Sequence, residues 1–167
     1  LTSKVWLIYE DDAGEWQAKD VADIADASKI PLPVDISISA DDNILWVDTW
    51  NDGMARVFDI SDPFSPKEVY TKNIGAQINM TSQSWDGTRV YFTSSLLANW
   101  DKKQSDTGDV QYFKAYDWDG KKLSHKFSID FIEEKLGLPH QMRFGAYSLY
   151  AKRSPLENAI RVATTQK

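Results

Sequence analysis

Hydrophobic and polar residues alternate along most of this chain with a period of two, and polar turn residues interrupt the alternation. Such alternation is typical of strands in antiparallel β-sheets, in which successive side chains point to opposite faces. The stretch VDISISADDNILWVDTW predicts two strands, near residues 34–39 and 44–49, joined by an Asp-Asp turn. A second stretch, INMTSQSWDGTRVYFTSS, predicts strands near residues 79–84 and 89–94, and the Asp-Gly between them is a strong hairpin signal.

The two predicted hairpins are copies of one another. Without gaps, Ser39 aligns with Ser84 and Asp41 with Asp86, an offset of 45 residues. A strand, an acidic turn and another strand follow each hairpin, in MARVFDISDPFSPKEVY and in VQYFKAYDWDGKKLSHKF, and the opening SKVWLIYEDDAGEWQAKDV has the same form. The chain thus predicts two complete four-stranded units and the outer hairpin of a third.

Repeats of about 40–50 residues with four strands each are typical of β-propeller blades, which bury their faces against neighbouring blades. We therefore predict an all-β fold, with about two and a half blades of a β-propeller over residues 1–144; an antiparallel sandwich with as many strands is the alternative. Residues 145–167 are predicted to form a C-terminal tail with a weak helical pattern. Shorter helical segments are expected within residues 20–29 and over residues 131–136.

The composition fits one ordinary domain. The chain has 167 residues, of which 42% are hydrophobic and 13% aromatic, so it can form a packed core. The net charge of −6 and the lack of a basic block argue against nucleic-acid binding, and no apolar run has the length of a transmembrane helix. Two and a half blades cannot close a ring, and the sequence begins with Leu1 rather than Met, so we expect further N-terminal blades in the parent protein.

Few residues of this sequence can carry chemistry. The chain has no cysteine, which excludes disulfides, thiolate metal sites and cysteine nucleophiles within it. His140 lies in a proline-stiffened loop after the last predicted strand, where it can be a metal ligand, a general base or a structural hydrogen-bonding residue. His125 alternates with Leu123 and Phe127 on a predicted outer strand, so we expect it to be exposed. These two are the chain's histidines, and one plausible ligand cannot complete a metal site.

The remaining candidates are carboxylates and tryptophans. Most carboxylates lie in predicted turns, where they bond to backbone amides, and no phosphate loop, dinucleotide fingerprint or calcium-loop spacing is present. Trp50 and Trp100 each follow a strand end, in TWNDG and NWDKK. Loops at strand ends face the propeller surfaces at which ligands bind, so these side chains can line an apolar pocket. Alternatively, they staple the loops to the blade edge.

Three stretches carry a resemblance to a known family. They are SWDGTRVYFTSSLLANWDK, the stretch DGMARVFDISDP before it and LPHQMRF after it. Over residues 5–144 the chain resembles the C-terminal part of the selenium-binding protein family, whose bacterial members are methanethiol oxidases. The Thr-Ser-Ser-Leu…Trp-Asp run and the Pro-His…Arg-Phe end are its most specific pieces, whereas unrelated propellers also use the Asp-Ile-Ser-Asp-Pro turn.

The resemblance implies a seven-bladed propeller and an oxidoreductase. Its reaction is the oxidation of methanethiol by O₂ and water to formaldehyde, hydrogen sulfide and hydrogen peroxide. It also implies copper as cofactor, and a soft thiol substrate suits a copper centre held by imidazoles. Because the other histidines of the family are not in this chain, we expect the remaining copper ligands outside it and expect the chain alone to be inactive.

The resemblance also assigns roles to individual residues. His140 is the implied copper ligand or its near neighbour. Arg143 is implied either as a partner of the metal site or as a clamp for the terminal loop. Trp100 and Asp101 match the loop that caps the adjacent strand end, which makes them, together with Trp50, candidates for the wall or lid of a pocket.

Two other classes of function stay open. One is a non-catalytic propeller that serves as a binding or interaction module. The other, a propeller lactonase, needs a carboxylate cluster of the calcium-binding type, for which the sequence gives no sign. The expected partners are methanethiol, O₂ and the missing N-terminal blades, with a homo-oligomer also compatible. Bacterial members are typically exported and animal members cytosolic; the motifs and the lack of cysteine favour the periplasm, with the cytoplasm as the alternative.

Overall fold

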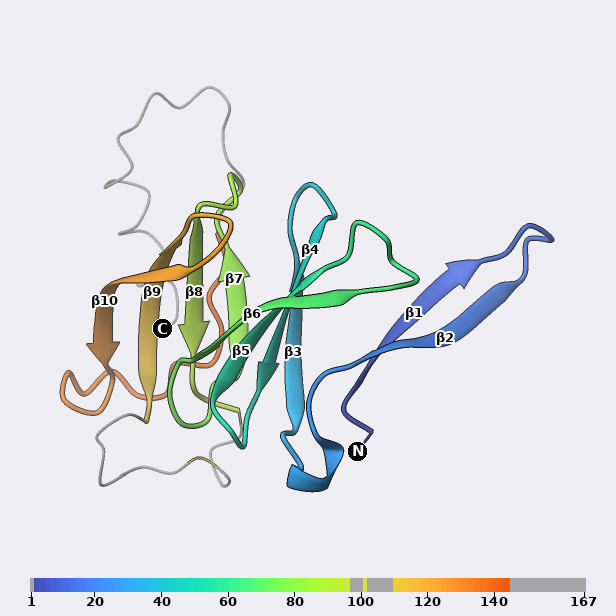
Figure 1. Ribbon diagram of the computed structural model, residues 1–167. Coiled ribbons are helices and arrows are strands. Elements are labelled where there is room, and N and C mark those ends of the chain that lie inside the picture. The colour runs from blue at the N-terminus through green and yellow to red at the C-terminus, as the bar shows by residue number, and fades with distance from the viewer. Residues whose placement is uncertain (1, 97–100, 102–109, 145–167) are drawn as a thin grey trace.

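The computed structural model describes residues 2–96, 101 and 110–144 (Figure 1). This part of the chain forms ten β-strands and one 3₁₀ turn, and the strands belong to three antiparallel sheets. The first sheet contains β1 (Lys4–Glu10) and β2 (Trp16–Asp23). The second contains β3 (Pro33–Ile38), β4 (Ile44–Thr49), β5 (Met54–Asp59) and β6 (Lys67–Asn73). The third contains β7 (Met80–Gln83), β8 (Arg89–Thr93), β9 (Tyr112–Trp118) and β10 (Leu123–Asp130).

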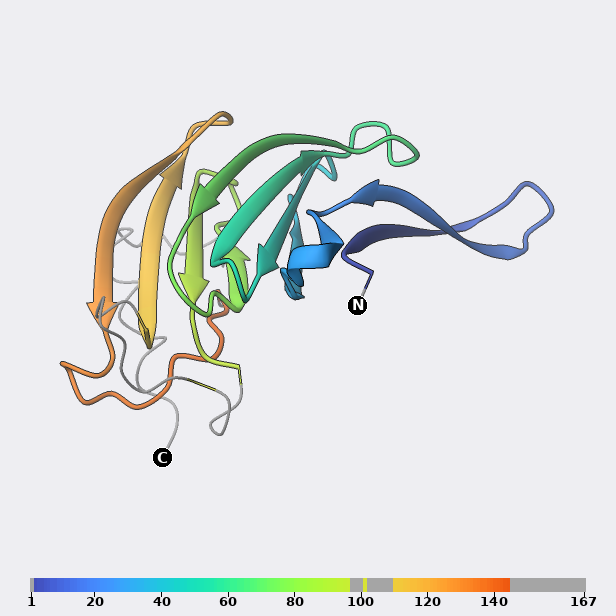
Figure 2. The same ribbon diagram turned by 60° about the horizontal axis from the view of Figure 1, so that its bottom comes forward.

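Each four-stranded sheet is a propeller blade. Its strands lie in the order in which they follow along the chain, β3-β4-β5-β6 in one blade and β7-β8-β9-β10 in the other. The first strands of the two blades, β3 and β7, contact one another, and the β1–β2 hairpin projects away from both blades (Figures 1 and 2). The structure thus confirms the prediction of two complete units and one further hairpin.

The 45-residue repeat extends to the hydrogen bonds in the first turn of each blade, which are the same in both blades. Ser39 Oγ donates a hydrogen bond to Asp41 at 2.5 Å, and Ser84 Oγ donates one to Asp86 at 2.6 Å. Each serine hydroxyl also accepts the backbone amide of the first residue of the following strand, at 3.0 Å in both turns. The serine–aspartate pair therefore sets the start of the second strand in both blades.

Apolar side chains fill the space between the blades. Trp46 of β4 and Phe92 of β8 are fully buried and lie edge to face, with ring centroids 6.0 Å apart. The opposite face of β4 packs towards the β1–β2 hairpin, in a cluster built from Ile24, Leu45, Val47 and Phe58, with Val5, Ala22 and Ile60 against it. Strand β4 is therefore buried on both faces, as stacked blades require.

Two expected helical segments have different outcomes. Within residues 20–29, strand β2 continues to Asp23 and a 3₁₀ turn follows at Ala27–Lys29, so one short turn forms. The helix expected over residues 131–136 is wrong, because hydrogen-bonded turns occupy this stretch. The carboxylate of Asp130 accepts the amides of Ile132 and Glu133, at 2.8 and 3.0 Å, as at a helix N-terminus. The stretch does not continue as a helix, because Lys135 adopts a left-handed conformation with a φ of 55°.

The tail expected at 145–167 lies outside the described residues, together with its helical pattern. Within the part of the chain that the structure describes, no helix is long and apolar enough to cross a membrane.

The blade interface generates the first prediction. Replacing Phe92 by Ala removes a fully buried ring between the two blades, and we expect the free energy of unfolding to fall by about 3–5 kcal/mol because of lost burial and the cavity left behind. Urea unfolding of the full-length protein measures it. Phe64→Ala is the control, since Phe64 is 45% exposed and should cost about 1 kcal/mol or less. Equal losses in the two variants would contradict this assignment of the core.

Candidate metal and substrate site beside the inner strands

The segment 139–144 is held against the last blade by its backbone carbonyls. Ser95 N donates to the carbonyl of Pro139 at 3.2 Å, and Thr93 Oγ1 donates to the carbonyl of His140 at 2.7 Å. Farther along, Ser82 Oγ donates to the carbonyl of Met142 at 2.5 Å. These bonds come from β7, from β8 and from the loop after β8, so they fix the position of His140 relative to the blade.

The imidazole of His140 has a defined hydrogen-bond partner. Its Nδ1 lies 2.7 Å from the carbonyl oxygen of Ser95, which can only accept. Nδ1 must therefore carry the proton, and the lone pair of the neutral ring sits on Nε2. Asn79 Nδ2 donates to the same carbonyl at 2.5 Å. A metal-ligating histidine typically donates its other ring N–H in this way, which fixes both tautomer and orientation.

Asp101 closes the loop on which that carbonyl lies. Its two carboxylate oxygens accept the hydroxyl of Ser95 at 2.6 Å and the amide of Leu96 at 3.0 Å, and the residue is only 7% exposed. Ser95 therefore links the two residues: its hydroxyl donates to Asp101, and its carbonyl accepts from His140. This explains why an acidic residue follows the strand here: it holds the loop that orients the histidine.

The described residues offer a metal ion one donor, His140, rather than a complete set of ligands. Among the described residues, no group of three or more His, Cys, Asp or Glu side chains is placed to hold a metal ion. His140 is exposed, and its Nε2 is the atom with a lone pair to offer. A copper ion at this position would need further ligands from outside the described part of the chain.

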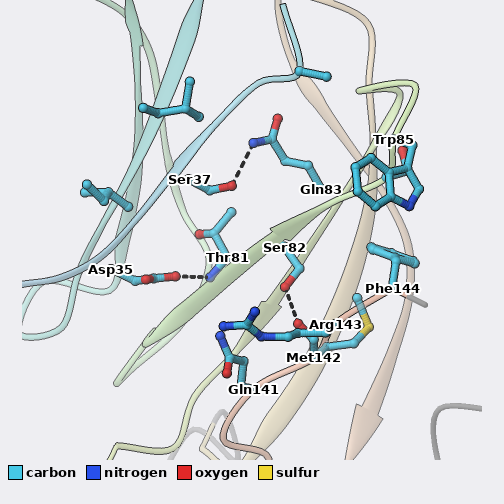
Figure 3. A pocket seen from close by; sticks show the side chains of 14 residues that line it. Asp35, Ser37, Thr81, Ser82, Gln83, Trp85, Gln141, Met142, Arg143 and Phe144 are labelled. Atoms are coloured by element: carbon cyan, nitrogen blue, oxygen red, sulfur yellow. Dashed lines mark hydrogen bonds between the residues drawn. The ribbon is translucent and has the colours of Figure 1, made fainter. Parts of the chain in front are cut away.

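A groove of about 440 Å³ runs along the inner strands beside this segment (Figure 3). Its walls come from β3, from β7 with the turn that follows it, and from residues 141–144. The lining residues are Asp35, Ile36, Ser37, Ile38, Ala40, Thr81, Ser82, Gln83, Ser84, Trp85, Gln141, Met142, Arg143 and Phe144. His140 immediately precedes this last group, so the candidate ligand and the groove belong to one region.

Two aspartates of one blade, Asp35 and Asp48, accept hydrogen bonds from strand β7 of the next blade. Asp35 Oδ2 of β3 accepts the backbone amide of Thr81 at 2.8 Å, and Asp48 Oδ2 of β4 accepts the hydroxyl of Thr81 at 2.6 Å. One residue of β7 thus binds two carboxyl groups of the neighbouring blade. Gln83 Nε2 adds a third contact by donating to Ser37 Oγ at 2.8 Å.

The two carboxyl groups differ in burial. Asp48 is fully buried, and no hydrogen-bond partner for its Oδ1 is found within the described residues. Burial raises the pKa of Asp48 well above its usual value; the Thr81 hydroxyl lowers it, and the nearby Asp35 raises it further. Burial also raises the pKa of Asp35, against the lowering effects of the Thr81 and Ile36 amides and of Arg143. Burial thus raises the pKa of both carboxyl groups, and that of Asp48 more strongly.

The other candidate residues are only partly brought together. Arg143 lines the groove and extends its guanidinium towards the Asp35 side (Figure 3). Trp50 is partly buried, and its amide donates to the carbonyl of Leu32 at 2.9 Å. It therefore lies just after β4 and beside the start of β3, which is the end of its blade that corresponds to the position of His140 in the next blade. No contact between Trp50 and His140 is found among the described residues. Trp100 lies outside the described residues. His125 is exposed on β10, as predicted.

Asp35 and Asp48 were not recognised from sequence as functional candidates. The sequence does contain one sign of an unusual carboxylate, because Asp48 interrupts the otherwise apolar strand ILWVDT. The residues on both sides of it, Val47 and Thr49, are buried in the structure. A charged residue is seldom fully buried without a partner. Its partner, Thr81, is 33 residues away in the next blade, and no local pattern shows that pairing.

Comparisons with known proteins agree with this geometry. Residues 1–147 match the family of the 56 kDa selenium-binding protein. The chain belongs to this family.

Relatives of the chain carry informative names. It is 64% identical over 151 residues to a methanethiol oxidase of Ruegeria pomeroyi, and 60% identical over 146 residues to one of Hyphomicrobium. These matches cover 90% and 87% of this chain but 34% and 33% of the relatives, so the chain spans about a third of their length.

Solved structures support the same family and fold. A hypothetical selenium-binding protein from Sulfolobus tokodaii matches with a TM-score of 0.62 and 26% identity, over 75% of this chain and 34% of that one. A periplasmic gluconolactonase of Pseudomonas aeruginosa matches with a TM-score of 0.59 and 15% identity, over 78% of this chain and 34% of that one. The second likeness concerns the fold alone.

The buried carboxyl generates a prediction about pH. The pKa of Asp48 is higher in the folded than in the unfolded protein, so its contribution to stability is present below the unfolded pKa of about 4 and is lost as pH rises. Asp48→Asn removes this loss. We expect the stability of the variant, relative to the parent, to rise as pH increases above about 4, as measured by urea unfolding at a series of pH values.

Asp86→Asn is the matched control with the opposite sign. Hydrogen bonds from Ser84 and Thr88 lower the pKa of Asp86 to about 2, so its stabilising effect is present above the unfolded pKa and is lost as pH falls towards 2. The relative stability of this variant should therefore decrease as pH rises from about 2 to about 4. The same direction of change in both variants would contradict the raised pKa of Asp48.

Proposed function

We propose that the full-length protein is a copper-dependent methanethiol oxidase and that this chain is its C-terminal portion. Methanethiol, O₂ and water would yield formaldehyde, hydrogen sulfide and hydrogen peroxide. The 64% and 60% identities to methanethiol oxidases, spread over nine-tenths of the chain, support the activity. The remaining two-thirds of such a protein would supply the other blades of a seven-bladed ring and the other metal ligands.

The single structural observation behind this proposal is the bond from His140 Nδ1 to the Ser95 carbonyl. It leaves Nε2 as the donor atom, and Asp101 and Asn79 hold in place the Ser95 residue to which Nδ1 is bound. Imidazole nitrogen is a ligand that suits copper. When bound, copper would supply the electron transfer between sulfur and O₂, which amino-acid side chains do not perform unaided.

The residues of this chain have roles that do not depend on the metal. Residues 141–144 form one wall of the groove, and His140 immediately precedes them, so the proposed ligand and the proposed thiol site belong to one segment. Arg143 presents positive charge to that space, which would favour the anionic form of a thiol. Ile36, Ile38 and Phe144 line the groove with apolar surface, suited to a methyl group.

The proposal predicts that copper and activity depend on His140. In the full-length protein we expect close to stoichiometric copper and release of hydrogen sulfide from methanethiol. His140→Ala should lose the metal, and hydrogen sulfide release should fall at least about 100-fold, as expected when a ligand of the reacting metal is removed. Metal analysis and a sulfide assay on the same preparations measure both.

His125→Ala is the control, because His125 is exposed on β10, lies outside the groove and is hydrogen-bonded through Nε2 to Ser128 at 2.8 Å. It should keep both copper and activity. Full copper retention in His140→Ala would contradict the ligand role of His140. A parent protein without metal and without activity would instead favour a non-catalytic binding module of the same family.

A further inference from the structure

Among the described residues that line the groove, Asp35 is the one carboxylate and Arg143 the one cation. Asp35 projects from β3, and Arg143 approaches from the segment after His140 (Figure 3). No ion pair joins them within the described part of the chain, but the charge of Arg143 acts on the Asp35 carboxyl. The groove therefore presents a carboxylate and a guanidinium that do not neutralise each other by direct contact.

The position of Asp35 is fixed from the neighbouring blade. Its Oδ2 accepts the Thr81 amide at 2.8 Å, and the hydroxyl of the same threonine binds Asp48. Asp48 is fully buried and has no surface from which to meet a ligand, whereas Asp35 is half-buried and lines the groove. Of the two carboxyl groups, Asp35 is the one that a molecule in the groove can reach.

We infer that Asp35 is the proton acceptor for a thiol bound in this groove. The S–H bond breaks, its electron pair stays on sulfur, and the proton moves to a carboxylate oxygen of Asp35. A thiol and a carboxylate thus become a thiolate and a carboxylic acid, and Arg143 offsets the new negative charge on sulfur. The inference rests on the proposed function, because the thiolate is the form that binds a metal and reacts.

The surroundings of Asp35 suit this role. A general base works best when its pKa lies near the working pH. Partial burial raises the pKa of Asp35, which moves it towards that pH. Arg143 from segment 139–144 lowers the pKa of Asp35, and Asp35 in turn raises the pKa of Asp48 of β4. Because Asp48 is fully buried and Asp35 lines the groove, Asp35 is the member of the pair that can take up a proton from a bound thiol.

The test uses the full-length, copper-loaded protein and the variant Asp35→Asn. Asn has nearly the same shape, and its Oδ1 can still accept the Thr81 amide, so the blade contact is kept. We expect kcat/KM for methanethiol to fall by about 10²–10⁴-fold. The acidic limb of its pH profile, which reports the pKa of the essential base in the free enzyme, should disappear. Asp35→Glu should restore part of the rate and shift that limb.

A second readout is independent of turnover. Anaerobic addition of methanethiol should produce the infrared C=O band of a newly protonated carboxyl group in the parent protein, and this band should be absent from Asp35→Asn. Asp48 is fully buried and does not line the groove, so it does not take up the proton of the thiol. If Asp35→Asn does not fold, the shift of the band in Asp35→Glu gives the answer.

Tyr70→Phe is the matched control. It removes another hydrogen bond between the two blades, which the Tyr70 hydroxyl accepts from the Leu123 amide at 3.2 Å, and it leaves the groove and Asp35 in place. Its pH profile and infrared band should match those of the parent. A parent without turnover would contradict the proposed function, and the infrared band would still decide the role of Asp35. An active parent whose acidic limb and band persist in Asp35→Asn would overturn the inference alone.

Discussion

The pairing of β7 with the neighbouring blade is the contact on which this part of the molecule depends. Thr81 donates its amide to Asp35 and its hydroxyl to Asp48, so one residue ties two strands of the next blade. Thr81 and Asp48 are buried and Asp35 is half-buried, and buried polar atoms need hydrogen-bond partners. Removing one partner there costs more than the bond is worth, because the other group is left desolvated. The apolar core around Trp46 and Phe92 supplies attraction, and the polar contacts determine alignment.

The geometry of the candidate site follows from this alignment. Asn79, just before β7, and His140, in the terminal segment, bind the same carbonyl of Ser95. Asp101 holds that residue from the other side. The groove then lies between strand β3, strand β7 and the segment that carries His140. The proposed base is thus positioned by β7, and the proposed metal ligand by Asn79 just before β7, by the end of β8 and by the loop that follows it.

Sequence alone could predict the local parts of this structure. The strand at 44–49 agrees with β4, and the Asp-Gly turn and the serine–aspartate pair of each blade were visible as a 45-residue repeat. The pattern failed at 131–136, where a short helix was expected but Lys135 adopts a left-handed conformation and a turn forms. Few residues other than glycine adopt this conformation, so a lysine gives no local sign of it.

The site itself was predictable only in part. His140 stood out because the chain has just two histidines, and the Trp-Asp loop stood out because it follows a buried strand. Asp35 did not, since its significance comes from a threonine 46 residues away in the next blade. Spacing along a chain does not show which residues meet across a blade interface. Roles shared between blades therefore become visible only when both blades are seen together.

The most direct test of this account is an anomalous diffraction map of the full-length, copper-loaded protein, recorded at the copper absorption edge. The account predicts a peak within bonding distance of His140 Nε2, while Nδ1 keeps its bond to the Ser95 carbonyl and the metal lies beside the groove that Asp35 lines. Copper bound to Nδ1, or bound at a place remote from His140, would contradict it.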